Sequence, residues 1–219
     1  MLQSRTRVKI CGLTRPEDVR AACAAGADAI GLVFYPKSSR LVSLEQARVL
    51  REAVPAMVSV VALFVNAQAE EVQQVLDHVR PDVLQFHGDE PPEYCASFGH
   101  RYLKAFRLGG PGLGEPQAVL QACRRYPHAT AWLFDSYSPG YGGSGLSFDS
   151  ALLQAVRQAP DSRPVILAGG LTPHTVAQSV RELRPYALDV SSGVEASGGI
   201  KSAEKIQAFM GAVREADGA

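Results

Sequence analysis

The sequence lacks an excess of either charge, because 22 lysines and arginines balance 22 aspartates and glutamates. A protein that binds nucleic acid or another polyanion normally carries a basic excess or a basic stripe. We therefore expect no nucleic-acid partner. Any phosphate that this chain binds must be held locally, by backbone N–H groups and the N-termini of helices.

Long apolar runs and cysteine motifs are also missing. Residues 1–7 contain no apolar stretch of the kind found in a secretory signal, and no apolar run approaches the roughly 20 residues that span a bilayer. The four cysteines, Cys11, Cys23, Cys95 and Cys123, form no CxxC pair and have no histidine partner at metal-ligand spacing. We expect a cytoplasmic protein with reduced thiols, no metal site and no membrane contact.

What the sequence does contain is a regular alternation of short apolar runs with amphipathic stretches. The apolar runs are typical of buried parallel strands. They are Val8–Cys11, Ala29–Phe34, Val58–Val65, Val83–Phe86, Tyr102–Phe106, Ala131–Asp135, Val165–Ala168 and Ala187–Val190. Helices are expected within Pro16–Ala25, Leu44–Ala53, Ala69–Val79, Pro92–Phe98, Gln117–Arg125, Ser150–Gln158, Pro173–Leu183 and Ser202–Val213. Thr14 and Thr172 are expected to cap two of them, each with proline at the first helical position.

The apolar runs are about 26 residues apart on average, which is the length of a compact βα unit. This alternation predicts an α/β protein with a parallel sheet, either open and doubly wound or closed into a barrel. Two features favour the barrel. No GxGxxG motif follows the first run, and glycine-rich turns recur after the last three runs, where barrels build phosphate sites. We predict a single-domain (β/α)8 TIM barrel over residues 1–219.

In such a barrel, functional residues lie at the carboxyl ends of the strands. The first run ends in Lys9-Ile10-Cys11-Gly12, and side chains alternate along a strand, so Lys9 and Cys11 share one face. Cys11 is a candidate general base or nucleophile, provided that Lys9 or nearby backbone dipoles lower the pKa of its thiol. The alternative is a small apolar core residue, which is our interpretation of the other three cysteines.

The sixth run ends in Phe134-Asp135-Ser136 and opens onto a glycine-rich loop. An aspartate after a strand commonly stabilises a turn or caps the next helix. The next predicted helix begins about a dozen residues later, so capping by Asp135 is not expected. A carboxyl group at the mouth of a barrel, under a loop that closes over it, can be desolvated enough to keep its proton. Asp135 is therefore a candidate general acid.

Three loops after the last strands combine glycine with serine or threonine. They contain Gly142-Gly143-Ser144-Gly145, Gly169-Gly170-Leu171-Thr172 and Ser191-Ser192-Gly193-Val194-Glu195. Glycines let successive N–H groups converge on an anion, and serine hydroxyls add donors. Each motif alone is more often a plain turn, but three in consecutive loops of one barrel indicate a phosphate site. The candidate ligands are Gly143, Ser144, Gly145, Gly169, Gly170, Ser192 and Gly193.

Other polar residues are expected at the same rim. Arg40, in the loop after the second run, suits bidentate binding of a carboxylate, and its alternative role is that of a solvated loop residue. His87 ends the fourth run and is a candidate substrate-loop residue, although a lone histidine more often makes structural hydrogen bonds. Asp189 lies inside the eighth run, where a carboxylate is unusual. Our hypothesis is an ion pair between Asp189 and Lys9 inside the barrel.

Several of these segments, taken in order, resemble the phosphoribosylanthranilate isomerase family. They are Lys9–Thr14, Gly26–Gly31, Phe34–Arg40, Gln85–Glu90, Phe134–Ser136 with the glycine loop behind it, Leu167–Pro173 and Leu188–Glu195. The resemblance spans nearly the whole chain, and its KICG and DVSSGVE pieces are specific. It departs at Phe86, where the family usually has leucine, and this is a conservative apolar change.

The resemblance implies a step of tryptophan biosynthesis, the Amadori rearrangement of N-(5-phosphoribosyl)anthranilate to 1-(2-carboxyphenylamino)-1-deoxyribulose 5-phosphate. It implies that Asp135 protonates the ring oxygen of the sugar, which opens to a Schiff base, and that Cys11 removes the proton from the second sugar carbon. It also implies that Arg40 holds the anthranilate carboxylate and that the glycine loops hold the phosphate. No metal or organic cofactor is expected, because the protonated imine accepts the electrons. The expected partner is a small phosphosugar, bound by a monomer or a homodimer.

Other functions fit parts of the pattern. A histidine-pathway aminoaldose isomerase shares the reaction type but uses paired aspartates, whereas the first strand here ends in Cys11. A ribulose-phosphate epimerase needs metal-binding histidines on several strands, and the five histidines of this chain lie mostly on predicted helices or in turns. A barrel that binds a phosphorylated metabolite without turning it over is the non-enzymatic alternative, and the intact pair of Cys11 and Asp135 argues against it.

Overall fold

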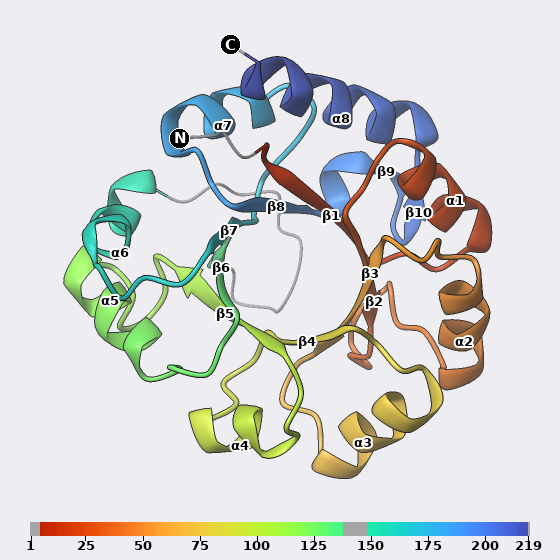
Figure 1. The fold of residues 1–219 in the computed structure, drawn as a ribbon, viewed down its shortest axis with the longest axis horizontal. Helices are drawn as coiled ribbons and strands as arrows, with labels where there is room; N and C mark the ends of the chain where they lie inside the picture. The colour runs from red at the N-terminus through yellow and green to blue at the C-terminus, as the bar shows by residue number, and fades with distance from the viewer. Residues whose placement is uncertain (1–4, 138–148, 219) are drawn as a thin grey trace.

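The computed structural model describes residues 5–137 and 149–218. Eight parallel strands form a closed barrel in sequence order, and β8 pairs with β1 to close it. Figure 1 shows the strands at the centre and the helices as an outer ring. The predicted (β/α)8 TIM barrel is confirmed.

The barrel elements follow one another along the chain as strand and helix pairs. The strands are β1 (Arg7–Cys11), β2 (Ala29–Val33), β3 (Ser59–Phe64), β4 (Val83–Phe86), β5 (Tyr102–Leu108), β6 (Ala131–Ser136), β7 (Val165–Leu167) and β8 (Ala187–Val190). The helices are α1 (Pro16–Ala24), α2 (Leu44–Glu52), α3 (Ala69–His78), α4 (Pro92–Ser97), α5 (Pro116–Arg124), α6 (Gln154–Gln158), α7 (Val176–Leu183) and α8 (Ala203–Asp217). Strand β5 is longer than predicted, because Arg107 and Leu108 continue its pairing with β6.

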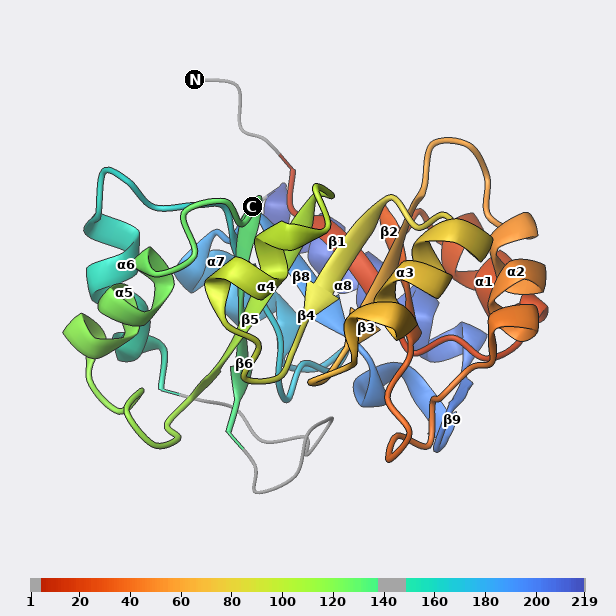
Figure 2. The same ribbon diagram turned by 90° about the horizontal axis from the view of Figure 1, so that it is seen from below.

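Four further elements were not predicted. The 3-10 helix η1 (Ser150–Leu153) forms the first half of the segment expected to be entirely α-helical. A second 3-10 helix, η2 (Ser192–Val194), follows β8. It leads into a small antiparallel hairpin of β9 (Glu195–Ser197) and β10 (Ile200–Lys201). In the side view, β9 lies beyond the barrel at the end where the strands terminate (Figure 2).

The two predicted threonine caps are wrong. Proline is indeed the first residue of α1, but the Thr14 hydroxyl donates to the carbonyl of Gly199, 2.6 Å away, and does not cap that helix. Helix α7 begins at Val176, after the predicted start. Thr172 instead closes a turn, in which its Oγ1 accepts from the N–H of Thr175 at 3.3 Å. The side-chain bond stabilises a turn where a helical turn was expected.

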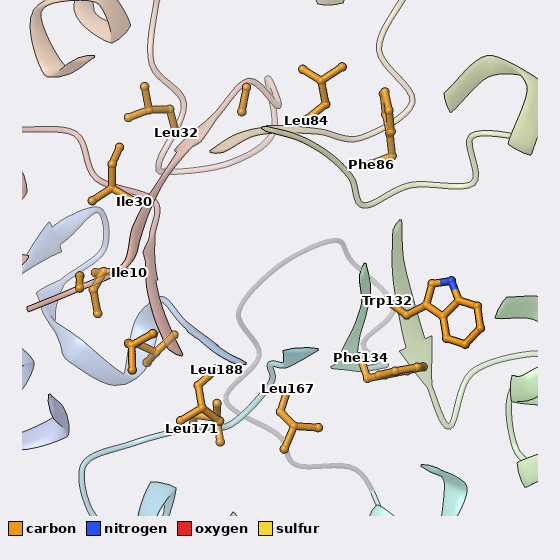
Figure 3. Close-up of a cluster of buried hydrophobic side chains, with 14 of the residues drawn as sticks. Ile10, Ile30, Leu32, Leu84, Phe86, Trp132, Phe134, Leu167, Leu171 and Leu188 are labelled. Atoms are coloured by element: carbon orange, nitrogen blue, oxygen red, sulfur yellow. The ribbon is translucent and has the colours of Figure 1, made fainter. Parts of the chain in front are cut away.

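The main core lies between the barrel wall and the helices. Figure 3 shows Ile10, Ile30, Leu84, Trp132 and Leu188 pointing away from the barrel axis. These side chains are almost fully buried. Because side chains alternate along each strand, the residues between them face the barrel interior. A separate interior cluster, with Val61, Val83, Leu103, Ala105, Ala131, Leu133, Ile166, Ala168 and Ala187, fills the barrel.

Phe86 belongs to the outer core. Its ring stacks on Phe98 with centroids 5.9 Å apart, and meets the rings of Tyr94 and Tyr102 edge-on at 5.8 Å. Aromatic pairs in these arrangements contribute about 0.5–1.5 kcal/mol beyond their buried area. The departure from leucine at this position therefore changes the packing between barrel and helices and not the barrel mouth.

Candidate active site

A cavity opens at the carboxyl ends of the strands, lined by residues from most of the barrel strands and the loops behind them. It brings together most of the residues singled out from the sequence, namely Cys11, Arg40, His87, Asp135, Gly169, Gly170, Asp189, Ser192 and Gly193. Gln85, which was not predicted, also lines it. Gly143, Ser144 and Gly145 lie outside the described residues. The other three cysteines lie on or against the outer core, as expected.

Cys11 ends β1 at the mouth of the barrel, with only 5% of its surface exposed. Lys9 precedes it by two residues on the same face, and its positive charge acts on the thiol. Burial raises the pKa of the thiol, whereas Lys9 and Lys201 act to lower it, and the net direction is upward. The sequence made a lowered pKa the condition for Cys11 to act as a thiolate, and the structure does not meet that condition, because desolvation and Asp189 outweigh the lysines.

Lys9 and Asp189 form the ion pair that was hypothesised from the sequence. They are register partners on β1 and β8, and Lys9 Nζ lies 2.8 Å from Asp189 Oδ2. Both side chains are buried. Burial alone lowers the pKa of Lys9, but Asp189 and Cys11 outweigh it and raise that pKa. The second carboxylate oxygen, Asp189 Oδ1, is buried without a hydrogen-bond partner in the described part of the chain.

Asp135 lies near the carboxyl end of β6, and two contacts hold its side chain. Its Oδ1 accepts from the N–H of Ser136 at 2.8 Å. Its Oδ2 lies 3.2 Å from His87 Nε2, close enough for an ion pair but not aligned as a hydrogen bond. The amide of Gln85 lies 3.1 Å from His87 Nδ1. Gln85 thus orients the histidine that stands beside the candidate acid.

The glycine positions let the loop after β7 approach the end of β6 and the loop after β8. Gly169 and Gly170 have φ values of 76° and 64°, which side chains rarely adopt. A Cβ at Gly169 would lie 2.7 Å from Asp135 Oδ1, and one at Gly193 would overlap the carbonyl of Leu171. Glycine is therefore required for the close packing of the backbone that lines this side of the cavity.

Arg40 reaches the cavity over Gly12, but part of its guanidinium is already engaged. Its Nε and Nη2 donate to the two carboxylate oxygens of Glu195, at 2.7 and 2.8 Å. Lys201 Nζ donates to Glu195 Oε1 at 2.9 Å and to the carbonyl of Ser191 at 3.1 Å. Burial acts to raise the pKa of Glu195, but Arg40 and Lys201 outweigh it and lower that pKa.

Sequence reasoning missed Glu195 and Lys201 as parts of the site. Glu195 ended a motif that was interpreted only as a phosphate loop. Lys201 gave no signal, because a lysine ahead of an amphipathic helix usually points into solvent. Gln85 could have been found, since a polar residue two positions before His87 on a four-residue strand faces the same way.

Several polar side chains that line the cavity have a buried atom that makes no hydrogen bond to the described residues. Gln85 Oε1, His87 Nε2 and Asp189 Oδ1 are buried without hydrogen-bond partners among the described residues, and all three residues line the cavity. Buried polar atoms cost free energy unless they are paired, so these atoms indicate where a polar ligand or water binds. No group of three or more histidine, cysteine or acidic side chains suited to a metal occurs within residues 5–137 and 149–218.

The chain is similar in sequence to one family over most of its length. The family described as N-(5'-phosphoribosyl)anthranilate isomerase matches residues 8–212. An N-(5'-phosphoribosyl)anthranilate isomerase of Bordetella bronchiseptica is 60% identical over 213 residues, which are 97% of this chain and 98% of that protein.

Solved structures give the same similarity in three dimensions. Phosphoribosyl anthranilate isomerase of Thermus thermophilus has a TM-score of 0.83 at 40% identity, covering 96% of this chain and 99% of that one. A phosphoribosyl anthranilate isomerase in complex with reduced 1-(o-carboxyphenylamino)-1-deoxyribulose 5-phosphate has a TM-score of 0.81 at 33% identity, with the same coverage. The similarity therefore includes a protein solved with a phosphorylated carboxyphenylamino sugar.

Proposed function

Because the chain belongs to the N-(5'-phosphoribosyl)anthranilate isomerase family, we propose that it catalyses the Amadori rearrangement of N-(5-phosphoribosyl)anthranilate in tryptophan biosynthesis. The product is 1-(2-carboxyphenylamino)-1-deoxyribulose 5-phosphate. The observation that carries this proposal is the convergence of Cys11, Asp135 and Arg40 on one cavity that the glycine loops after β7 and β8 also line. An acid, a base, a carboxylate ligand and a phosphate cradle are the groups that this substrate requires.

The reaction begins with Asp135 as general acid. Its carboxyl group donates a proton to the ring oxygen of the furanose, and the ring opens as the C–O bond breaks, leaving a protonated Schiff base. His87, held by Gln85 and 3.2 Å from Asp135, fixes the carboxyl group at this position. Proton transfer by a positioned side chain contributes about 10²–10⁴-fold to the rate.

Cys11 then acts as general base. Its thiolate removes the proton from the second sugar carbon, and the electron pair moves into the protonated imine to give an enolamine. The enolamine tautomerises to the ketone. Because the imine itself accepts the electrons, the step calls for no metal or organic cofactor. The positive charge of Lys9 favours the thiolate in a site where burial opposes it.

The remaining residues hold the two ends of the substrate. Arg40 binds the anthranilate carboxylate through the part of its guanidinium that Glu195 leaves available. Gly169, Gly170, Ser192 and Gly193 bind the phosphate with backbone N–H groups and a hydroxyl. Gly143, Ser144 and Gly145, outside the described residues, are proposed to complete that cradle.

The proposed setting is a cytoplasmic monomer or homodimer that binds a small phosphosugar and no nucleic acid. No helix in the described part of the chain is long and apolar enough to cross a membrane. The equal numbers of positive and negative side chains, 22 of each, support a ligand that is recognised by local contacts and not by the net charge of the protein.

Turnover of the substrate tests the proposal. N-(5-phosphoribosyl)anthranilate is strongly fluorescent, and its conversion depletes that emission. Purified protein should abolish the signal at a rate proportional to enzyme concentration. Unchanged emission, together with binding of the reduced product analogue, would instead identify a barrel that binds the phosphosugar without rearranging it.

A further inference from the structure

The hairpin β9–β10 is not part of the barrel, yet it places two charged side chains beneath Arg40. Glu195 and Lys201 face each other in its register. The turn packs on the loop that carries Arg40, since a Cβ at Gly199 would lie 3.0 Å from the carbonyl of Ser39. The Thr14 hydroxyl ties the same turn to the loop after β1. The hairpin is therefore anchored to both loops that flank the candidate carboxylate site.

Arg40, Glu195 and Lys201 form a charge trio that reaches the cavity through one member only. Lys201 is fully buried, and the side chains of Glu195 and Arg40 are 7% and 15% exposed. Arg40 lines the cavity, whereas neither Glu195 nor Lys201 does. Glu195 occupies Nε and Nη2 of Arg40, and Nη1 has no hydrogen-bond partner among residues 5–137 and 149–218.

The charges of the trio decide what Arg40 can bind. An isolated Arg40–Glu195 pair would be neutral, and its attraction for a second carboxylate would be weak. Lys201 bonds to the same carboxylate and restores one net positive charge. A cluster with two cations and one anion, of which Arg40 lines the cavity, is matched to a ligand with one negative charge at that end.

We propose that Glu195 and Lys201 are positioning residues for the proposed reaction, which select a substrate whose aromatic amine bears one carboxylate. Glu195 fixes the Arg40 guanidinium so that Nη1 faces the substrate. Lys201 supplies the positive charge that Glu195 would otherwise cancel. The inference rests on the proposed function, because it needs a turnover that depends on the anthranilate carboxylate.

The test compares two substrates that differ only in that group, N-(5-phosphoribosyl)anthranilate and N-(5-phosphoribosyl)aniline. The measured quantity is the ratio of their kcat/KM values. Lys201→Met leaves the trio neutral, and we expect the ratio to fall about 10- to 100-fold. Lys201 also acts to lower the pKa of Cys11, so a loss that acts through the base affects both substrates and cancels in the ratio. The loss confined to the anthranilate substrate should be in KM, because the lost interaction is one of binding.

A double variant separates charge from structure. Lys201→Met with Glu195→Gln returns the trio to one positive charge, and it should restore the ratio to within about 5-fold of wild type. It also serves as the test if Lys201→Met alone does not fold. The matched control is Lys205→Met, since the exposed Lys205 donates only to the backbone carbonyl of Glu195 and should leave the ratio unchanged.

Three outcomes overturn the inference. Equal losses on both substrates in Lys201→Met assign that lysine a structural role only. An unchanged ratio in Lys201→Met, or a double variant that discriminates worse than the single one, contradicts the charge argument. If wild-type protein turns over neither substrate, the proposed function itself is wrong, and that result is distinct from the other three.

Discussion

Gly31 of β2 is the register partner of Cys11 of β1, and a Cβ at Gly31 would lie 2.6 Å from Cys11 Sγ. The same Cβ would lie 3.1 Å from Lys9 Cε. The Cys11 thiol and the aliphatic part of the Lys9 side chain therefore occupy the space that a side chain at this position of β2 would fill. Glycine here serves the site on the neighbouring strand, not the conformation of its own backbone.

Gly31→Ala should displace the thiol. Overpacking a buried site costs about 1–3 kcal/mol, and small shifts of a reacting group cost up to about 10²-fold in rate. We expect both losses, measured by urea unfolding and by substrate turnover. The matched control is Gly211→Ala on α8, where a Cβ meets nothing within 4 Å. That change should add about 0.5–1 kcal/mol of stability and leave turnover intact. Equal behaviour of the two variants would contradict the packing argument.

Replacing only one member of the buried pair of Lys9 and Asp189 should lower the free energy of unfolding more than replacing both members. Lys9→Met leaves a buried carboxylate without its cation, which costs about 3–5 kcal/mol of unfolding free energy. Lys9→Met combined with Asp189→Leu removes both charges and should recover most of that loss. Urea unfolding of the single and double variants measures the difference. An Asp189→Ala variant with full stability and full activity would rule out the role of this pair.

The activity should depend on pH through the Cys11 thiol. Burial raises its pKa in the free protein, so kcat/KM should rise with pH as the thiolate forms, and should still be rising at the pH where an ordinary thiol has ionised. Lys9 acts to lower the same pKa, and Lys9→Met should therefore move this rising limb to higher pH. A pH profile of kcat/KM for both proteins decides the matter. A flat profile would show that Cys11 is not the base, and a limb shifted to lower pH would contradict the role of Lys9.

A second buried ion pair fixes the loop after β4, next to His87. Lys104 Nζ lies 2.9 Å from Glu90 Oε2 and 2.7 Å from the carbonyl of Gly88. Glu90 Oε1 also accepts from the N–H of Asn66 at 2.8 Å. Lys104→Met leaves Glu90 buried without its cation.

That variant should lose about 3–5 kcal/mol of unfolding free energy. It should also lose turnover, because the loop that carries His87 is no longer held. The control is Arg124→Met, which breaks an exposed bidentate pair with Asp161 and should leave the urea midpoint unchanged. A midpoint that is equally unaffected in Lys104→Met would show that the buried pair does not hold the loop.

Much of the fold could be predicted because it follows from periodicity. The alternation of buried and interior positions along β1 put Lys9 and Cys11 on one face, and the ladder with β8 brings Asp189 opposite Lys9. The glycine motifs after β7 and β8 indicated the rim of the cavity. These inferences need only the direction of each side chain and the order of the strands.

The missed features depend on geometry that no local pattern encodes. The link from Lys201 through Glu195 to Arg40 requires the register of the β9–β10 hairpin and its packing on two distant loops. The start of α7 was wrong because Thr172 bonds within a turn. The direction of the pKa shift of Cys11 depends on the balance between burial and two lysines, and only the packed structure sets that balance.

The central claim is that Asp135 and Cys11 are the acid and the base of one rearrangement. Its most direct test measures the rate at which wild type, Cys11→Ser and Asp135→Asn deplete the fluorescence of N-(5-phosphoribosyl)anthranilate. Circular dichroism should first establish that all three are folded. We expect wild type to consume the substrate and each variant to be slower by about 10²–10⁴-fold or more. Near-wild-type depletion by either folded variant would contradict the role assigned to that residue.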